Sequence, residues 1–124
     1  MRDALLVALG GATGSVLRWW LSGAVARATG TLTFPWGTLA VNLAGSFAIG
    51  TLLGLAEGRD GLAPGVRLLL VTGVLGGFTT FSAFSWETLA LVRAGQVPAA
   101  IGYAAGSVAG GLLAALAGLV FGRR

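Results

Sequence analysis

Apolar residues fill most of the chain and gather into four long stretches, which short polar segments separate. A helix needs about 20 mostly apolar residues to cross a bilayer. Each stretch is long enough, and the third contains paired glycines and threonines. The pattern predicts an all-α integral membrane protein in one domain, 1–124, with four transmembrane helices and a mid-membrane break in the third. The expected helices cover roughly residues 4–26, 35–56, 66–93 with the break at 76–80, and 98–121.

The composition indicates lipid rather than water as the solvent. The 124 residues are 56% hydrophobic and 10% charged, whereas soluble domains carry about 25% charged residues. The chain contains no cysteine and no histidine, so thiolate metal sites and the commonest general base are unavailable. The glycine-rich "GGATGS" lacks the Lys-Ser/Thr of a phosphate-binding loop, and no nucleophile–base pair is visible. We therefore do not expect an enzyme.

The positive charge is carried by arginines, which are scattered mostly at the ends of the predicted helices. The net charge is +4, and a nucleic-acid-binding protein would need such charges gathered on one exposed face. Their positions indicate anchoring at a membrane surface, so the expected partner is a lipid bilayer and no nucleic acid. Four helices would put both termini on one side, together with most of the arginines. The positive-inside rule then favours cytoplasmic termini.

Glycines recur at four-residue spacing in each of the predicted helices. In lipid, small residues at this spacing let helix backbones approach closely, so packing explains most of them. Four short helices enclose little interior, and a polar pathway would therefore need a second subunit. The glycines in question are Gly10 and Gly14, Gly50 and Gly54, Gly73 and Gly77, and Gly102, Gly106 and Gly110.

Two polar side chains in the first two predicted helices need more than packing to explain them. Arg18 lies well inside the first helix, and intramembrane ionisable groups usually mark function. It can face an anion, or it can reach the far interface beside Trp19 and Trp20. Asn42 begins a stripe that continues one turn later with Ser46. Its amide can belong to a polar pathway or hydrogen-bond a neighbouring helix.

The most unusual stretch is "GGFTTFSAFSWE", residues 76–87. Its glycines weaken the helix, and non-helical backbone at membrane depth survives only when it is buried in protein or lines water. Unwound carbonyls of this kind can coordinate a cation. Phe81 and Phe84 share a face, where their rings either pack or turn their positive edges toward a small anion. Ser82 and Ser85 add hydroxyl donors.

Three more polar side chains follow toward the end of the chain. Glu87 can pair with an arginine, cap a helix or face water, and the sequence does not choose among these. Tyr103 and Ser107 are four residues apart in the last predicted helix and offer two hydroxyls on one stripe. They can extend a polar pathway, or they are an interfacial tyrosine and a small packing serine.

Three motifs, "GGATGSVLRWW", "GTLAVNLAGSF" and "GGFTTFSAFSWE", together resemble the CrcB/Fluc fluoride channel family. The resemblance covers all four predicted helices in order. It implies a passive, fluoride-selective ion channel that exports cytoplasmic fluoride down its electrochemical gradient and confers fluoride resistance. It also implies a multi-pass protein of the bacterial inner (cell) membrane, assembled as a dual-topology homodimer of two antiparallel copies.

The same resemblance implies which residues form the site. A structural sodium ion at the dimer interface would be held by the backbone carbonyls of Gly77 and Thr80. Phe81 and Phe84 would line the fluoride pathway, with the Asn42 amide reaching toward their rings. The other residues that the resemblance assigns to the pathway are Arg18, Ser82, Glu87, Tyr103 and Ser107.

One position departs from the family pattern, and two other classes of protein are alternatives. Ala83 stands where the family commonly has a hydroxyl residue, so one donor of the pathway would be missing. A small dual-topology multidrug exporter driven by protons also has four helices, but it needs a membrane-embedded carboxylate. Here the first helix carries Arg18 instead, and the nearest acid is Glu87. A scaffold protein whose glycines serve packing alone would conduct no ions.

Overall fold

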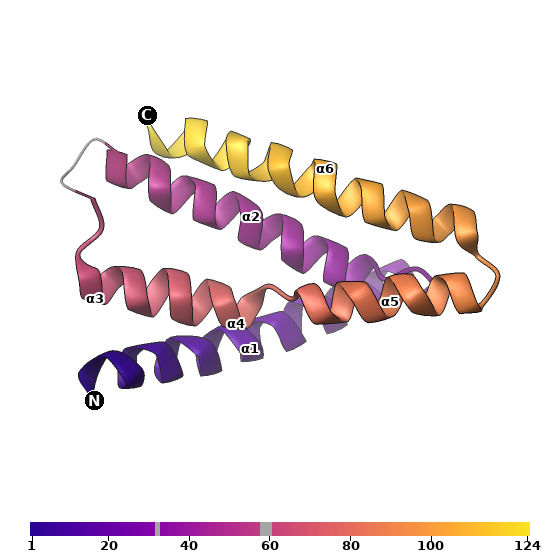
Figure 1. Ribbon diagram of the computed structural model, residues 1–124, viewed down its shortest axis with the longest axis horizontal. Helices are drawn as coiled ribbons and strands as arrows, with labels where there is room; N and C mark the ends of the chain where they lie inside the picture. The colour runs from indigo at the N-terminus through magenta and orange to yellow at the C-terminus, as the bar shows by residue number, and fades with distance from the viewer. Residues whose placement is uncertain (32, 58–60) are drawn as a thin grey trace.

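The computed structural model describes residues 1–31, 33–57 and 61–124, and all regular structure within these ranges is helical (Figure 1). In this described part, four helical spans are long and apolar enough to cross a membrane. Three of them are continuous helices: α1 (Arg2–Thr29), α2 (Trp36–Glu57) and α6 (Val97–Gly122). The other span, Pro64–Arg93, is built from α3 (Pro64–Arg67), η1 (Leu68–Leu75), α4 (Gly76–Phe78) and α5 (Phe81–Arg93).

Prolines and glycines set the ends of these helices. Pro64 opens α3 and Pro98 is the second residue of α6, where a missing N–H costs little. Gly30 ends α1 in the left-handed conformation, with φ 63°, and its N–H bonds back to the Ala26 carbonyl. Gly95, with φ 75°, makes the tight turn between α5 and α6. Positive φ values cost glycine little conformational free energy, because it has no Cβ atom. They let consecutive spans fold back on each other.

The membrane-spanning helices pack against one another in pairs (Figure 1). α2 and α6 lie side by side over most of their length, while α1 packs against η1 and α4. α5 turns away from α1 and contacts α6. The N and C termini lie at the same end of the molecule, as an even number of spans requires.

Glycine lets the paired backbones touch, as the four-residue spacing indicates. A methyl group at Gly14 of α1 would collide with the carbonyl oxygen of Val74 in η1, and one at Gly50 of α2 would collide with that of Ala115 in α6. The α1–η1 and α2–α6 contacts are therefore backbone against backbone. Gly102 and Gly106 face open space, because no described atom beyond their own helical turns lies within 4 Å of an added methyl group.

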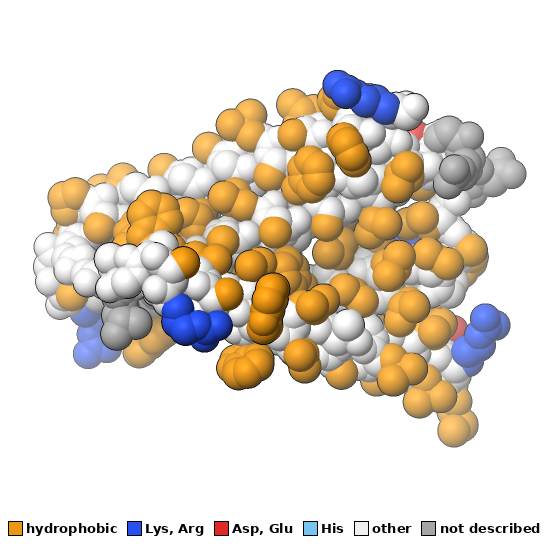
Figure 2. Space-filling view, turned by 180° about the vertical axis from the view of Figure 1, so that it is seen from behind, with side chains coloured by type: hydrophobic (Ala, Val, Ile, Leu, Met, Phe, Trp, Pro, Cys, Tyr) orange, Lys and Arg blue, Asp and Glu red, His pale blue; other side chains and the backbone are white. Residues whose placement is uncertain are grey.

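Very little apolar surface is buried inside this chain. The largest side chains fully enclosed by the described residues are those of Tyr103 and Val41. Large apolar side chains are exposed on every span, and Figure 2 shows them covering one face between basic side chains at the two ends. Water would not tolerate a surface of this kind on a monomer, whereas acyl chains solvate it. The fold is that of a multi-pass membrane protein.

The third span contains a π-helix, which the hydrophobic pattern does not predict. The N–H of Gly76 bonds to the carbonyl of Val71, five residues back, and η1 extends over eight residues. A π-helix is wider than an α-helix and usually occurs as one turn near a functional site. Here it leads directly into α4 and the break that follows.

Candidate functional site

The third span is interrupted at Thr79 and Thr80, whose backbones are extended. Thr79 has φ −83° and ψ 157°, and Thr80 has φ −151° and ψ 119°. Thr79 closes the last turn before the break, because its N–H and its hydroxyl both bond to the Leu75 carbonyl at 2.9 Å. The N–H groups that follow are displaced from their helical acceptors. The break therefore leaves main-chain polar groups in need of other partners.

Asn42 of α2 supplies two of these partners. Its Nδ2 donates to the Thr80 carbonyl at 3.1 Å, and its Oδ1 accepts from the Thr80 N–H at 2.9 Å. The side-chain amide of Asn42 thus pairs with both the N–H and the C=O of Thr80, as a neighbouring strand does in a β-sheet. The role suggested by the resemblance, an amide reaching toward the phenylalanine rings, stays a prediction. The hydrogen bonds in the structure go to the backbone of the break.

Thr80 also starts the helix after the break. Its Oγ1 accepts a hydrogen bond from the Ala83 N–H at 3.2 Å, which is the usual geometry of a threonine N-cap. The same hydroxyl lies 3.3 Å from the hydroxyl of Ser82. Ala83 therefore contributes a main-chain donor to the cap, and Ser82 sits on the exposed side of it.

Phe81 and Phe84 lie on the first turn of α5, as their spacing predicts for two residues on one face. Their ring centroids are 5.5 Å apart and tilted by 43°. Phe81 is 79% exposed, whereas Phe84 is half-buried. The centroid of the Phe84 ring also lies 5.3 Å from that of the Tyr103 ring. Both rings line a cavity of about 390 Å³, here named the phenylalanine cavity. The polar residues of its wall are Asn42, Ser46, Thr79 and Thr80.

Glu87 is held by two hydroxyl groups from two other helices. Thr38 Oγ1 donates to Oε1 and Tyr103 OH donates to Oε2, each at 2.7 Å. Tyr103 is fully buried and Thr38 nearly so. Of the three roles left open for Glu87, the arginine pair is not found among the described residues, where hydroxyls bind the carboxylate instead. The half-buried Glu87 lines two cavities, so a role facing water stays a prediction. We call Thr38, Glu87 and Tyr103 the hydroxyl–carboxylate cluster.

Thr38 is the member of this cluster that the sequence reasoning missed. The signal was present, because Thr38 lies one turn before Asn42 and two turns before Ser46 on the same stripe of α2. Threonine is common in membrane helices, where its hydroxyl usually bonds to its own backbone, as that of Thr51 does. The partner across 49 residues could not be predicted from spacing.

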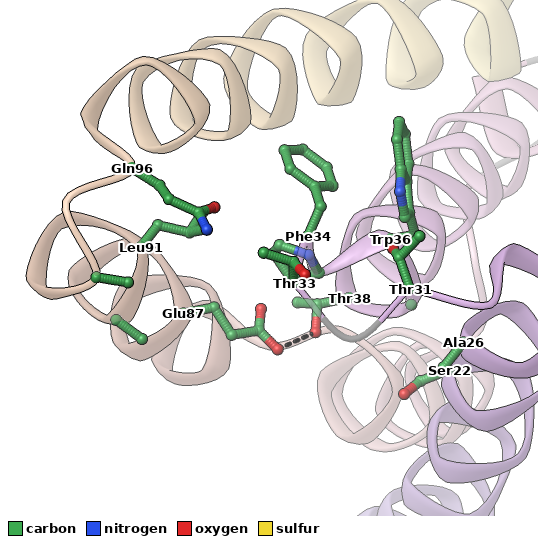
Figure 3. A pocket seen from close by; sticks show the side chains of 14 residues that line it. Ser22, Ala26, Thr31, Thr33, Phe34, Trp36, Thr38, Glu87, Leu91 and Gln96 are labelled. Atoms are coloured by element: carbon green, nitrogen blue, oxygen red, sulfur yellow. Dashed lines mark hydrogen bonds between the residues drawn. The ribbon is translucent and has the colours of Figure 1, made fainter.

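Two further cavities meet at this cluster. Figure 3 shows the first, of about 420 Å³, with the Glu87 carboxylate of α5 pointing toward Thr38 of α2. Its other walls include Ser22, Thr31, Thr33, Phe34 and Gln96. The second, of about 320 Å³, is lined by Thr38, Glu87 and Thr80 together with Arg18 of α1. The half-buried Arg18 thus faces the same space as the break and the cluster.

The remaining predicted residues are placed as follows. Ser107 lies one turn beyond Tyr103 on α6, and its buried hydroxyl has no hydrogen-bond partner within the described ranges. Gly77 lies in α4 against the backbone of Gly11. In an unbroken helix its carbonyl would accept from the Phe81 N–H, but the extended backbones of Thr79 and Thr80 move that N–H out of the helical register. The Gly77 carbonyl and one lone pair of the Thr80 carbonyl are therefore free to act as hard oxygen ligands.

The fold and this site define a class: a small multi-pass membrane protein whose third span is broken beside a row of aromatic rings and hydroxyls. A family model described as "CrcB-like protein, Camphor Resistance (CrcB)" matches residues 5–119. The chain belongs to this CrcB-like family.

Several relatives match over almost their whole length. The chain is 46% identical over 123 residues to the "Fluoride-specific ion channel FluC" of Allorhizobium ampelinum, covering 99% of this chain and 98% of the relative. It is 49% identical to the protein of that name from Chelativorans sp., with the same coverage. Its identity to the one from Chloroflexus aurantiacus is 47%, covering 99% and 97%.

Proposed function

We propose that this protein is a fluoride-specific ion channel and not an enzyme. The observation that carries the proposal is the full-length identity of 46–49% to relatives that bear this name. We infer that it lets cytoplasmic fluoride leave a bacterial cell passively, down its electrochemical gradient, and so confers fluoride resistance. Its place would be the cell (inner) membrane, with several spans crossing the bilayer.

The physical task of such a channel is dehydration. Fluoride is small and holds its water tightly, so a selective path must replace that water with donors, yet bind weakly enough to release the ion. The positive ring edges of Phe81 and Phe84 can serve as weak donors. Beyond them, Phe84 touches Tyr103, whose hydroxyl leads to Glu87 and Thr38. This order of groups supports a path from ring edges to hydroxyls.

Glu87 has a specific part in this proposal. In the structure both hydroxyls of the cluster donate to its carboxylate, which keeps Thr38 and Tyr103 turned toward one point. An arriving fluoride is a competing acceptor for the same protons. Arg18 faces the neighbouring cavity, and its positive charge would lower the cost of bringing an anion near a carboxylate.

We further propose that the channel is a homodimer of two antiparallel copies, inserted with dual topology. Extended backbone cannot face acyl chains, so the break at Thr79 and Thr80 must be covered by protein or lie against water. Phe81 is 79% exposed beside this break, and the phenylalanine cavity is open in the single chain. A second copy placed there would cover the break and complete the walls of the path.

A structural sodium ion fits the same place. When bound, it would supply positive charge near the anion path and a contact between the two copies. Gly77 and Thr80 carry the carbonyls that would hold it, because the extended backbone at the break displaces the helical donor of one and leaves a lone pair on the other. Asn42 would keep the Thr80 carbonyl in position for this role.

Fluoride efflux from liposomes tests the channel assignment. Purified protein is reconstituted with potassium fluoride inside, and a fluoride electrode records release after valinomycin is added. We expect fluoride release without chloride release, and we expect Phe81→Ile and Phe84→Ile to abolish it. Trp86→Ile, which removes an exposed aromatic ring from the same helix, is the matched control. Unchanged flux in both phenylalanine variants would remove those rings from the path.

A further inference from the structure

An apolar groove lies on the outer surface where α2 meets α6. It has a volume of about 460 Å³ and is apolar along its whole length except at one end, which Arg124 forms. The Phe47 ring of α2 and the Phe121 ring of α6 meet in it, with centroids 5.9 Å apart. The rest of its lining comes from α6, namely Leu113, Leu116, Ala117 and Val120.

The length of this groove corresponds to one leaflet of a bilayer. From Leu113 to Gly122, the last residue of α6, the helix axis advances about 14 Å, at about 1.5 Å per residue. Half of a hydrocarbon core about 30 Å thick is about 15 Å. The groove therefore runs from the headgroup level, where α6 ends, to the middle of the membrane. A single acyl chain of a phospholipid has this reach.

The charge at the end of the groove is positive. Arg123 is engaged by Glu57 at the end of α2, with Nη2 donating to Oε1 at 2.9 Å, and this hydrogen bonding raises the pKa of the Arg123 guanidinium. Arg124 forms no ion pair with the described residues. Its guanidinium is therefore the charge that a ligand at the headgroup level would meet, and this group suits a phosphate.

We propose that this groove is a binding site for an anionic phospholipid, with one acyl chain along α6 and the phosphate on Arg124. A second copy of the chain is the other possible occupant. That copy is assigned by the proposed function to the phenylalanine cavity, whose lining shares no residue with this groove. The lipid site does not depend on which ion the protein conducts.

Native mass spectrometry of the full-length protein in detergent tests the site. The protein is titrated with dioleoylphosphatidylglycerol, with the zwitterionic dioleoylphosphatidylcholine, and with inorganic phosphate, and bound molecules are counted per chain. We expect the anionic lipid to bind first, and Arg124→Gln to weaken it by roughly five- to tenfold, the usual effect of one arginine at a membrane surface. Leu116→Trp, which fills the groove, should weaken both lipids. Arg27→Gln removes an equal charge from the end of α1 and should change neither.

Three results would overturn the proposal. Equal binding of the anionic lipid by Arg124→Gln and the parent protein would remove the phosphate contact. Displacement of the lipid by millimolar inorganic phosphate would indicate a free-anion site instead. A lower dimer fraction in Leu116→Trp, with lipid binding unchanged, would assign the groove to a second copy.

Discussion

Replacing Asn42 by leucine should disorder the break in the third span. Leucine keeps the branched shape of the side chain but has none of its polar atoms. The change removes the two hydrogen bonds, of 3.1 and 2.9 Å, that join α2 to the Thr80 backbone. Leaving a fully buried N–H or C=O unpaired costs about 1–3 kcal/mol, and the half-buried Thr80 groups should lie at the lower end of this range. The broken conformation should therefore lose about 2 kcal/mol relative to its alternatives.

This loss can be expressed as a population. A difference of about 1.4 kcal/mol is a factor of ten, so a loss of about 2 kcal/mol makes the ordered break roughly 30-fold less populated relative to other conformations. Fluoride efflux should fall accordingly if conduction needs the ordered break. The Thr80 amide should exchange with deuterium faster by at least a similar factor, because Asn42 is its acceptor in the structure.

Two measurements on the same variant separate the possible roles of Asn42. Hydrogen exchange at the Thr80 amide, followed by NMR in detergent micelles, reports the break directly, and liposome efflux reports conduction. Thr51→Val is the matched control, because it removes a polar group from α2 whose hydroxyl bonds within its own helix. Lost efflux with unchanged exchange at Thr80 would refute the reasoning and indicate that the amide contacts the ion itself.

Other predictions concern packing and the cluster. Gly14→Ala should lower the unfolding free energy by about 1–3 kcal/mol, because the added methyl group collides with the Val74 carbonyl; Gly102→Ala, placed in open space, should leave the thermal midpoint in detergent unchanged or raise it, and equal effects would contradict the backbone contact. Tyr103→Phe deletes one of the two donors to Glu87 and should cost about 1.5–3 kcal/mol of stability, with slower efflux in the electrode assay. Efflux equal to that of the parent protein would exclude the Tyr103 hydroxyl from the path.

The apolar pattern predicted helical spans because lipid solvation needs little beyond length and hydropathy. It also pointed to the glycine and threonine pairs that surround the break, since those residues weaken a helix wherever they stand. Contacts between helices are different, because they depend on rotation about each axis. That is why the Asn42–Thr80 pairing and the partner of Thr38 could not be predicted from spacing.

The glycines also show that sequence spacing does not predict which residues touch a neighbouring helix. Gly14 and Gly102 occupy similar positions in four-residue repeats, yet one touches a neighbouring backbone and the other faces open space. Nothing in the repeat itself distinguishes them. The π-helix over Leu68–Leu75 is a further case, because its apolar residues suit an α-helix equally well.

The wide turn before the break has a consequence for the length of the chain. A π segment holds one residue more than an α-helix would between the same two ends. Loss of one residue within Leu68–Leu75 can be absorbed by narrowing the turn, so that the helix faces before and after it keep their directions. The same loss in α2 between Trp36 and Asn42 would rotate every later side chain of that helix by about 100° and carry Asn42 away from its partner. The number of residues in the third span before the break can therefore change by one, whereas the number of residues in α2 before Asn42 cannot.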